Sequence, residues 1–74
     1  MAESFTFDFI GEHLVVAPGS GGWNLELNKI SWNGRPAKYD IRSWSEDHQK
    51  MGKGLTLTKD ELTALKALLN NIGI

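Results

Sequence analysis

Apolar and polar residues alternate along much of this chain, and the alternation predicts β-strands. In the segment Lys38–Trp44 successive side chains point to opposite faces of a strand, so Tyr39 and Ile41 share one face. Such a strand offers positive charge to a polyanion and a flat ring on which a base could stack, although a plain solvated sheet face would carry similar charges. The charge and the ring lie on the face opposite Tyr39 and Ile41, which we expect to point outward and which carries Lys38, Asp40, Arg42 and Trp44.

The N-terminal part of the chain predicts one long first strand. Aromatic and polar residues alternate over Phe5–Ile10, and a β-rich composition resumes over Leu14–Ala17. Gly11 lies between the two runs, where a residue without a Cβ tolerates a bulge or bend. Period-two aromatic residues usually fill a core, and we expect this of Phe5, Phe7 and Phe9.

A second strand is predicted over Trp23–Trp32, but its apolar residues change parity along the way. They occupy odd positions up to Leu27 and even positions from Ile30 onward. Either a bulge near Asn28 restores the register or the second half presents its apolar residues to the other face, and the pattern leaves both open. The dipeptide Asn33-Gly34 is a strong hairpin signal and makes the strands on either side of it neighbours.

The rest of the chain predicts a mobile polar connection over Ser45–Met51, a short strand over Leu55–Leu57 and a helix. Thr58 and Glu61 have the spacing of a capping box at the helix start. The apolar stripe of the helix is broader than one sheet face would cover, so a second copy of the helix is an expected partner. Its apolar residues at helical spacing are Leu62, Leu65, Leu68, Leu69 and Ile72.

Length and composition narrow the class of protein. A chain of 74 residues forms one domain, residues 1–74, and a domain of this size buries only about 60% of the surface of its unfolded chain. Without cysteine it has no disulfide, which leaves oligomerisation as a common source of added stability. No apolar run reaches the roughly 20 residues of a membrane span and the N-terminus lacks a signal-peptide pattern, so we expect a cytoplasmic protein.

Charge is distributed unevenly, although the net charge is only −1. Residues 29–54 contain six Lys and Arg against three Asp and Glu, a net charge of +3, and the remainder of the chain is acidic. This asymmetry is typical of a domain with one cationic face. With so few cations, the number of phosphates neutralised and the salt dependence of binding should both be modest.

Catalytic and metal chemistry are not indicated. His13 and His48 are far apart in sequence without metal-ligand spacing, so we expect both to be solvated and no metal or cofactor to bind. Residues 43–48 contain the types of a hydrolytic triad but no nucleophile elbow, and the glycine-rich loop 18–22 lacks the Lys-Ser/Thr ending of a phosphate-binding loop. We therefore expect no enzyme and no small-molecule substrate.

Several motifs together resemble a known family. They are K-Y-D-I-R-S-W at residues 38–44, M-G-K-G-L-T-L-T at 51–58 with a helix after it, and L-N-K-I-S-W-N-G at 27–34. The chain resembles the positive cofactor four family of transcriptional coactivators, in its bacterial YdbC-like branch, from Phe5 to Ile72. The likeness is densest over Leu27–Leu57.

The resemblance implies an α+β fold: a four-stranded antiparallel curved sheet followed by one C-terminal α-helix, assembled as a homodimer. It also implies binding of single-stranded DNA with little sequence preference and no catalytic activity, in transcription or DNA maintenance. Eukaryotic members carry a serine- and lysine-rich regulatory tail that this chain lacks, so contacts with activators are not implied.

The resemblance also nominates seven nucleic-acid-binding residues. Arg42 and Lys53 match the backbone-contacting cations of the family, and Trp32 and Trp44 lie near its stacking aromatics. The remaining three are Lys38, which shares the face of Arg42, and the secondary candidates Lys29 and Trp23. Two alternatives stay open: single-stranded RNA on the same surface, since stacking does not distinguish the sugars, and a protein-interaction module built on exposed tryptophans.

Overall fold

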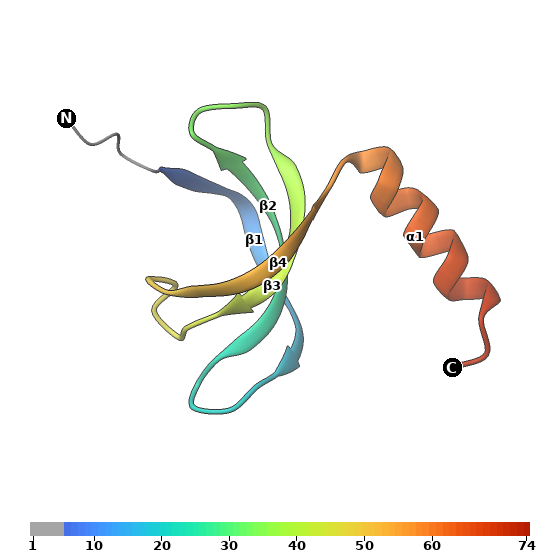
Figure 1. Ribbon diagram of the computed structural model, residues 1–74, viewed down its shortest axis with the longest axis horizontal. Coiled ribbons are helices and arrows are strands. Elements are labelled where there is room, and N and C mark those ends of the chain that lie inside the picture. Colours follow the sequence, from blue (N-terminus) through green and yellow to red (C-terminus); the bar gives the residue numbers. More distant parts are fainter. Residues whose placement is uncertain (1–5) are drawn as a thin grey trace.

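Four strands and one helix make up the computed structural model, which describes residues 6–74 (Figure 1). Each strand pairs antiparallel with the next, in the order β1-β2-β3-β4. The predicted α+β fold, four antiparallel strands followed by a C-terminal helix, is therefore confirmed. The elements are β1 (Phe7–Pro18), β2 (Asn24–Trp32), β3 (Lys38–Trp44), β4 (Met51–Leu57) and α1 (Lys59–Asn71).

Strand β1 is bent where the sequence predicts it. Its pairing with β2 shifts register between Ile10 and Leu14, and Gly11 inside this interval has a φ of 82°. A positive φ is accessible to glycine because it has no Cβ, which explains why the bulge falls here. Of the three expected core aromatics, Phe7 and Phe9 pack edge to face with ring centroids 5.6 Å apart, while Phe5 lies outside the described residues.

Strand β2 keeps one register along its pairing with β3, from Asn24 opposite Trp44 to Ile30 opposite Lys38. The change of apolar parity is therefore not corrected by a bulge: β2 is apolar on one face in its first half and on the other face in its second half. The hairpin that follows is confirmed, with φ values of 51° and 76° at Asn33 and Gly34, as a type I′ turn requires.

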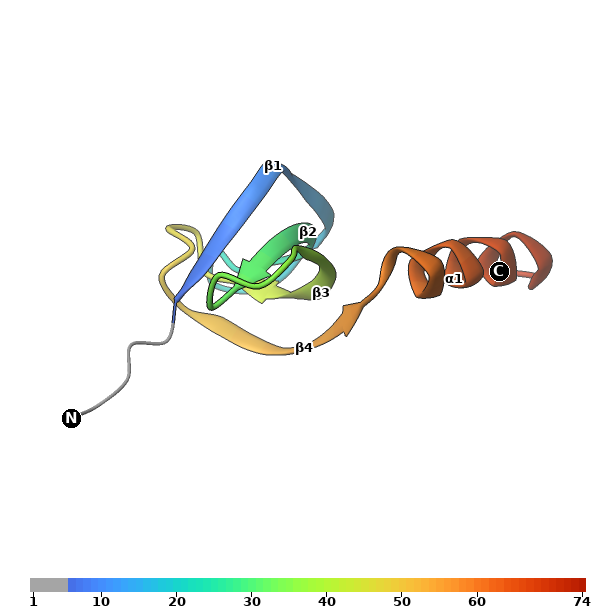
Figure 2. The same cartoon turned by 90° about the horizontal axis from the view of Figure 1, so that it is seen from above.

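The sheet curls strongly, so that β1 and β4 lie on either side of the two central strands (Figure 2). We call the concave side the inner face. Ile30 and Trp44 are fully buried there, and the rings of Phe7 and Phe9 reach across from β1 to within 5.4 and 4.9 Å of the Trp44 ring. Such aromatic contacts stabilise a core beyond the area they bury.

The burial of Trp44 corrects the expectation of an outward-facing indole. The division of β3 by parity is right, since Asp40 and Trp44 share a face, but both side chains are fully buried. The curl of the sheet encloses this face, whereas Tyr39 and Ile41, on the opposite face of β3, lie on the convex outer side and are only half-buried.

Helix α1 begins with the predicted capping box: Thr58 Oγ1 accepts from the N–H of Glu61, and Glu61 Oε1 accepts from the N–H of Thr58. The helix contacts the sheet at β3 and β4 and contains no buried residue. It stands beside the sheet in both views (Figures 1 and 2). Within residues 6–74, no helix is long and apolar enough to cross a membrane.

An apolar groove of about 450 Å³ separates the helix from the outer face of the sheet. Large apolar side chains around it are exposed on both elements, among them Leu14, Val16 and Leu69. The outer face is therefore the incompletely covered side of the molecule. The groove is lined by Val16, Leu27, Ile41, Leu62, Leu65, Lys66, Leu69 and Asn70.

Because Trp44 fills the core, we expect Trp44→Ala to lower the free energy of unfolding by about 3–5 kcal/mol, the range for removing a buried large aromatic side chain. Urea denaturation followed by circular dichroism measures the loss. Trp23→Ala is the matched control, because Trp23 is only half-buried and should lose less. Wild-type stability in the Trp44 variant would contradict the placement of this indole.

Candidate nucleic-acid interface

A buried ion pair lies at the centre of the inner face. The Asp40 carboxylate is fully buried and accepts two hydrogen bonds of 2.7 Å from Arg42, one from Nε to Oδ1 and one from Nη2 to Oδ2. Thr56 Oγ1 donates to Oδ2 of the same carboxylate across the β3–β4 pairing. A charge removed from water needs such partners, so Asp40 holds the Arg42 guanidinium in one place.

Arg42 in turn lies against the first predicted stacking residue. Its guanidinium carbon is 4.9 Å from the ring centroid of Trp32, within range of a cation–π interaction. Trp32 is half-buried, and the Arg42 side chain is 15% exposed. The structure therefore brings Arg42 and Trp32 together on the inner face, with both side chains reaching solvent at its margin.

The Gly-Lys-Gly element supplies the space that Arg42 needs. Gly54 pairs with Arg42 across β3 and β4, and a Cβ added to Gly54 would collide with Cβ and Nε of Arg42 and with the carbonyl oxygen of Ile41. The glycine at position 54 therefore leaves room for the Arg42 side chain. Lys53 lies where β4 has a register shift opposite β3, and it is exposed.

The other predicted residues divide between the two faces. Lys38 is exposed and shares the face of Asp40 and Arg42 by parity. Lys29 lies on the outer face, where it pairs with Tyr39 and its Nζ is 5.8 Å from the tyrosine ring centroid. Trp23 precedes β2 and lies at the far end of that strand from Trp32, half-buried.

Trp23 lines a small open pocket of about 430 Å³ beside the loop that joins β3 to β4. This loop, residues 45–50, is closed by two hydrogen bonds: the backbone N–H of Ser45 donates to the carbonyl oxygen of Lys50, and the backbone N–H of Lys50 donates to the Ser45 hydroxyl. The backbone N–H of Gln49 and the hydroxyl of Ser45 donate to the Asp47 carboxylate and hold its pKa below the ordinary value. The loop therefore has a defined conformation, in which His48 adopts a φ of 59°.

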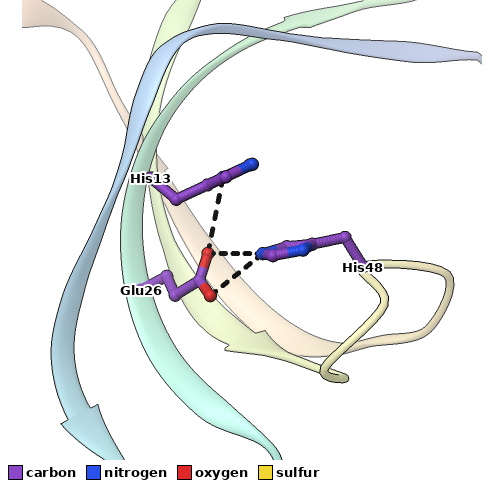
Figure 3. A group of neighbouring side chains, drawn as sticks. All are labelled: His13, Glu26 and His48. Carbon is purple, nitrogen blue, oxygen red and sulfur yellow. Dashed lines mark hydrogen bonds and ion pairs between the residues drawn. The ribbon is translucent and has the colours of Figure 1, made fainter.

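The expectation that the two histidines are lone residues is wrong, although His13 is exposed as expected and His48 is half-buried. The rings of His13 and His48 stack with centroids 4.1 Å apart, and both approach the carboxylate of the buried residue Glu26 (Figure 3). The sequence around the two histidines does not indicate this contact, because it forms only where the bulge in β1 and the β3–β4 loop bring the rings together. One signal was available: Glu26 and Asn28 occupy the same parity in β2 as Ile30, which places polar groups in the core.

Comparisons with known proteins identify relatives of this chain. A family model described as Transcriptional Coactivator p15 (PC4) matches residues 20–68. An uncharacterized protein of Treponema pallidum (strain Nichols) is 49% identical over 72 residues, which cover 97% of this chain and 85% of the relative. The region matched by the family model contains strands β2, β3 and β4 and most of helix α1.

The packing of Gly54 against Arg42 yields a prediction about stability. Gly54→Ala should destabilise the fold by about 1–3 kcal/mol, because the added methyl group displaces the Arg42 side chain or separates β3 from β4. Thermal unfolding measures the effect. Gly73→Ala is the matched control, since a Cβ there meets no atom within 4 Å. Equal melting temperatures for the two variants would refute the steric argument.

Proposed function

This chain belongs to the family of transcriptional coactivator p15 (PC4), and we propose that it binds single-stranded DNA as a homodimer with little sequence preference. The family indicates a nucleic-acid-binding, coactivator-like and non-enzymatic role. The observation that carries the finer proposal is the pairing of a fixed guanidinium with an indole, Arg42 against Trp32, at the margin of the inner face.

Phosphate contacts are assigned to Lys38, Lys53 and Arg42. Both lysines are exposed, and neither forms an ion pair with another residue of the described range 6–74. A guanidinium has five N–H donors, of which Asp40 takes two and the Met51 sulfur one, so Arg42 retains donors for a phosphate oxygen. The pairing with Asp40 orients those donors before any nucleic acid binds.

Base stacking is assigned to Trp32. An aromatic ring contributes about 1–3 kcal/mol per stacked base and accepts any base, which suits binding without sequence preference. Trp44 is left out of this surface because its ring is covered by Phe7 and Phe9. Lys29 is left out because it lies on the outer face, and Trp23 is left out because it lies at the end of β2 far from Trp32.

The homodimer is supported by the incomplete burial of the outer face. The radius of gyration is 13.7 Å, whereas a compact domain of this length has about 11 Å. An isolated helix of 13 residues is marginal in water and gains its stability from packing, yet α1 has no buried residue. A second copy seated on the apolar groove would cover the exposed side chains of both elements.

We expect Lys38→Ala and Lys53→Ala each to weaken binding of an oligo-dT strand severalfold and to reduce the slope of log affinity against log salt by about 0.7. Trp32→Ala should weaken binding by about 1–3 kcal/mol and leave the slope unchanged, because stacking releases no counterions. Fluorescence anisotropy of a labelled strand at several salt concentrations measures both quantities.

Lys59→Ala is the matched control for the two lysine variants, because Lys59 is an exposed cation at the start of α1, away from the inner face. Unchanged affinity in folded Lys38 and Lys53 variants would refute the assigned surface. Matched RNA and duplex competitors in the same titration test the strand preference. If RNA binds more tightly than single-stranded DNA, RNA becomes the proposed partner.

The proposed dimer has its own test. Leu65→Glu places a charge in the apolar groove and should convert the dimer to a monomer, since desolvating an unpaired carboxylate at the interface is costly. Light scattering coupled to size-exclusion chromatography measures the mass. Ala67→Glu introduces the same charge at an exposed position of α1 that does not line the groove, and should remain dimeric. A monomeric wild-type protein would refute the dimer.

A further inference from the structure

The carboxylate of Glu26 is buried beside two imidazoles, and we propose that these three groups form a binding site for a divalent transition-metal ion such as Zn²⁺. Glu26 comes from β2, His13 from the bulged part of β1 and His48 from the β3–β4 loop (Figure 3). One nitrogen of each ring and one oxygen of the carboxylate all lie within 4.8 Å of one another.

The charge of Glu26 is the first argument for a cation. Its side chain is 3% exposed, and in residues 6–74 the basic groups within ion-pair distance of it are the two histidines, which carry a charge only when protonated. Arg42 is opposite Glu26 in the β2–β3 register, but its guanidinium is directed to Asp40. A buried carboxylate needs a counterion or a metal, and neutral imidazoles supply only hydrogen bonds.

The ligand distances are the second argument. In a tetrahedral zinc site, ligand atoms lie about 3.3 Å apart, given metal–ligand bonds of about 2.0–2.2 Å. His48 Nε2 is 3.0 Å from Glu26 Oε1, and His13 Nδ1 is 3.6 Å from the same oxygen. Two of the three separations therefore already match a metal-bound arrangement.

The third separation, between the ligand nitrogens of the two histidines, closes if the His13 ring turns. The imidazoles are nearly parallel, with 16° between their planes, whereas a shared ion must lie in the plane of both rings. The His13 side chain is 37% exposed, and its ring turns toward a shared ion when Nδ1 gives up its 2.8 Å hydrogen bond with Asn28 Oδ1, while His48 is held by its loop. On binding, His13 Nδ1 would exchange its hydrogen bond with Asn28 Oδ1 for the ion, and His48 Nε2 would exchange its hydrogen bonds with the Glu26 carboxylate. Each ligating ring would then carry its proton on its other nitrogen.

The surroundings provide the support that metal ligands usually have. Asn28 Nδ2 donates to Glu26 Oε1 at 3.0 Å and so fixes the orientation of the carboxylate. Phe9 packs against both rings, with centroids 4.4 Å from His13 and 5.5 Å from His48, and shields one side of the cluster. Two imidazoles and one carboxylate are ligands typical of zinc, with a fourth position left for water.

A metal at this position would join three segments that are distant in sequence: β1, β2 and the β3–β4 loop. Small domains without disulfides commonly gain stability from such a link, and this chain has no cysteine. The ion would hold the loop against the sheet, because His48 is the loop's contact with Glu26. The proposed role is therefore structural.

The test is titration of chelator-treated full-length protein with Co²⁺, whose visible absorption reports a site with nitrogen ligands, followed by displacement with Zn²⁺. We expect one ion per chain, and at least about tenfold weaker binding in His13→Ala and in His48→Ala. Mg²⁺ should not compete, because it prefers oxygen ligands. Zn²⁺ should also raise the melting temperature of the wild-type protein but not that of His13→Ala.

Glu26→Gln tests the third ligand, and Glu12→Gln is its matched control: Glu12 is an exposed carboxylate next to His13 and outside the cluster. If the Glu26→Gln variant does not fold, the His13→Ala variant still tests the metal site, because His13 is exposed. The proposal is overturned if the wild-type protein shows no saturable binding, or if His13→Ala binds Co²⁺ as tightly as the wild type.

Discussion

The ion pair between Asp40 and Arg42 determines much of the inner face. A fully buried carboxylate requires a permanent counterion, and a guanidinium supplies one in a geometry that engages both oxygens. The long Arg42 side chain then needs room beside β4, which only a glycine at position 54 leaves. The guanidinium held in this way lies 4.9 Å from the ring centroid of Trp32, so the requirement of one buried carboxylate accounts for both the glycine and the position of the cation beside the indole.

The same curl that buries this pair reverses the two faces of the sheet. Alternation along β3 assigns residues to faces correctly, but it does not say which face is enclosed. Charged residues usually mark the solvent side of a half-buried strand, and here Asp40 and Arg42 lie on the enclosed side because they neutralise one another. Apolar residues such as Ile41 remain on the outer side, where they line a groove rather than a core.

Features that depend on local chemistry were therefore predictable, and those that depend on curvature were not. The capping box at Thr58, the turn at Asn33-Gly34 and the bulge at Gly11 follow from the backbone preferences of single residues. The burial of Trp44 depends on how far the sheet closes, to which every strand contributes. The contact between His13 and His48 needs two irregular segments to meet, and no periodicity encodes such a meeting.

The inner face consequently holds two buried carboxylates on neighbouring strands with different means of neutralisation. In the β2–β3 register Glu26 is opposite Arg42 and Asn28 is opposite Asp40, so the two acids are diagonal neighbours. One guanidinium cannot engage both, and it engages Asp40. Asn28 shields Glu26 by donating to it, but an amide carries no charge. In the described residues, the basic groups within reach of the second acid are the imidazoles of His13 and His48, so neutralising Glu26 depends on their protonation or on an ion that they bind.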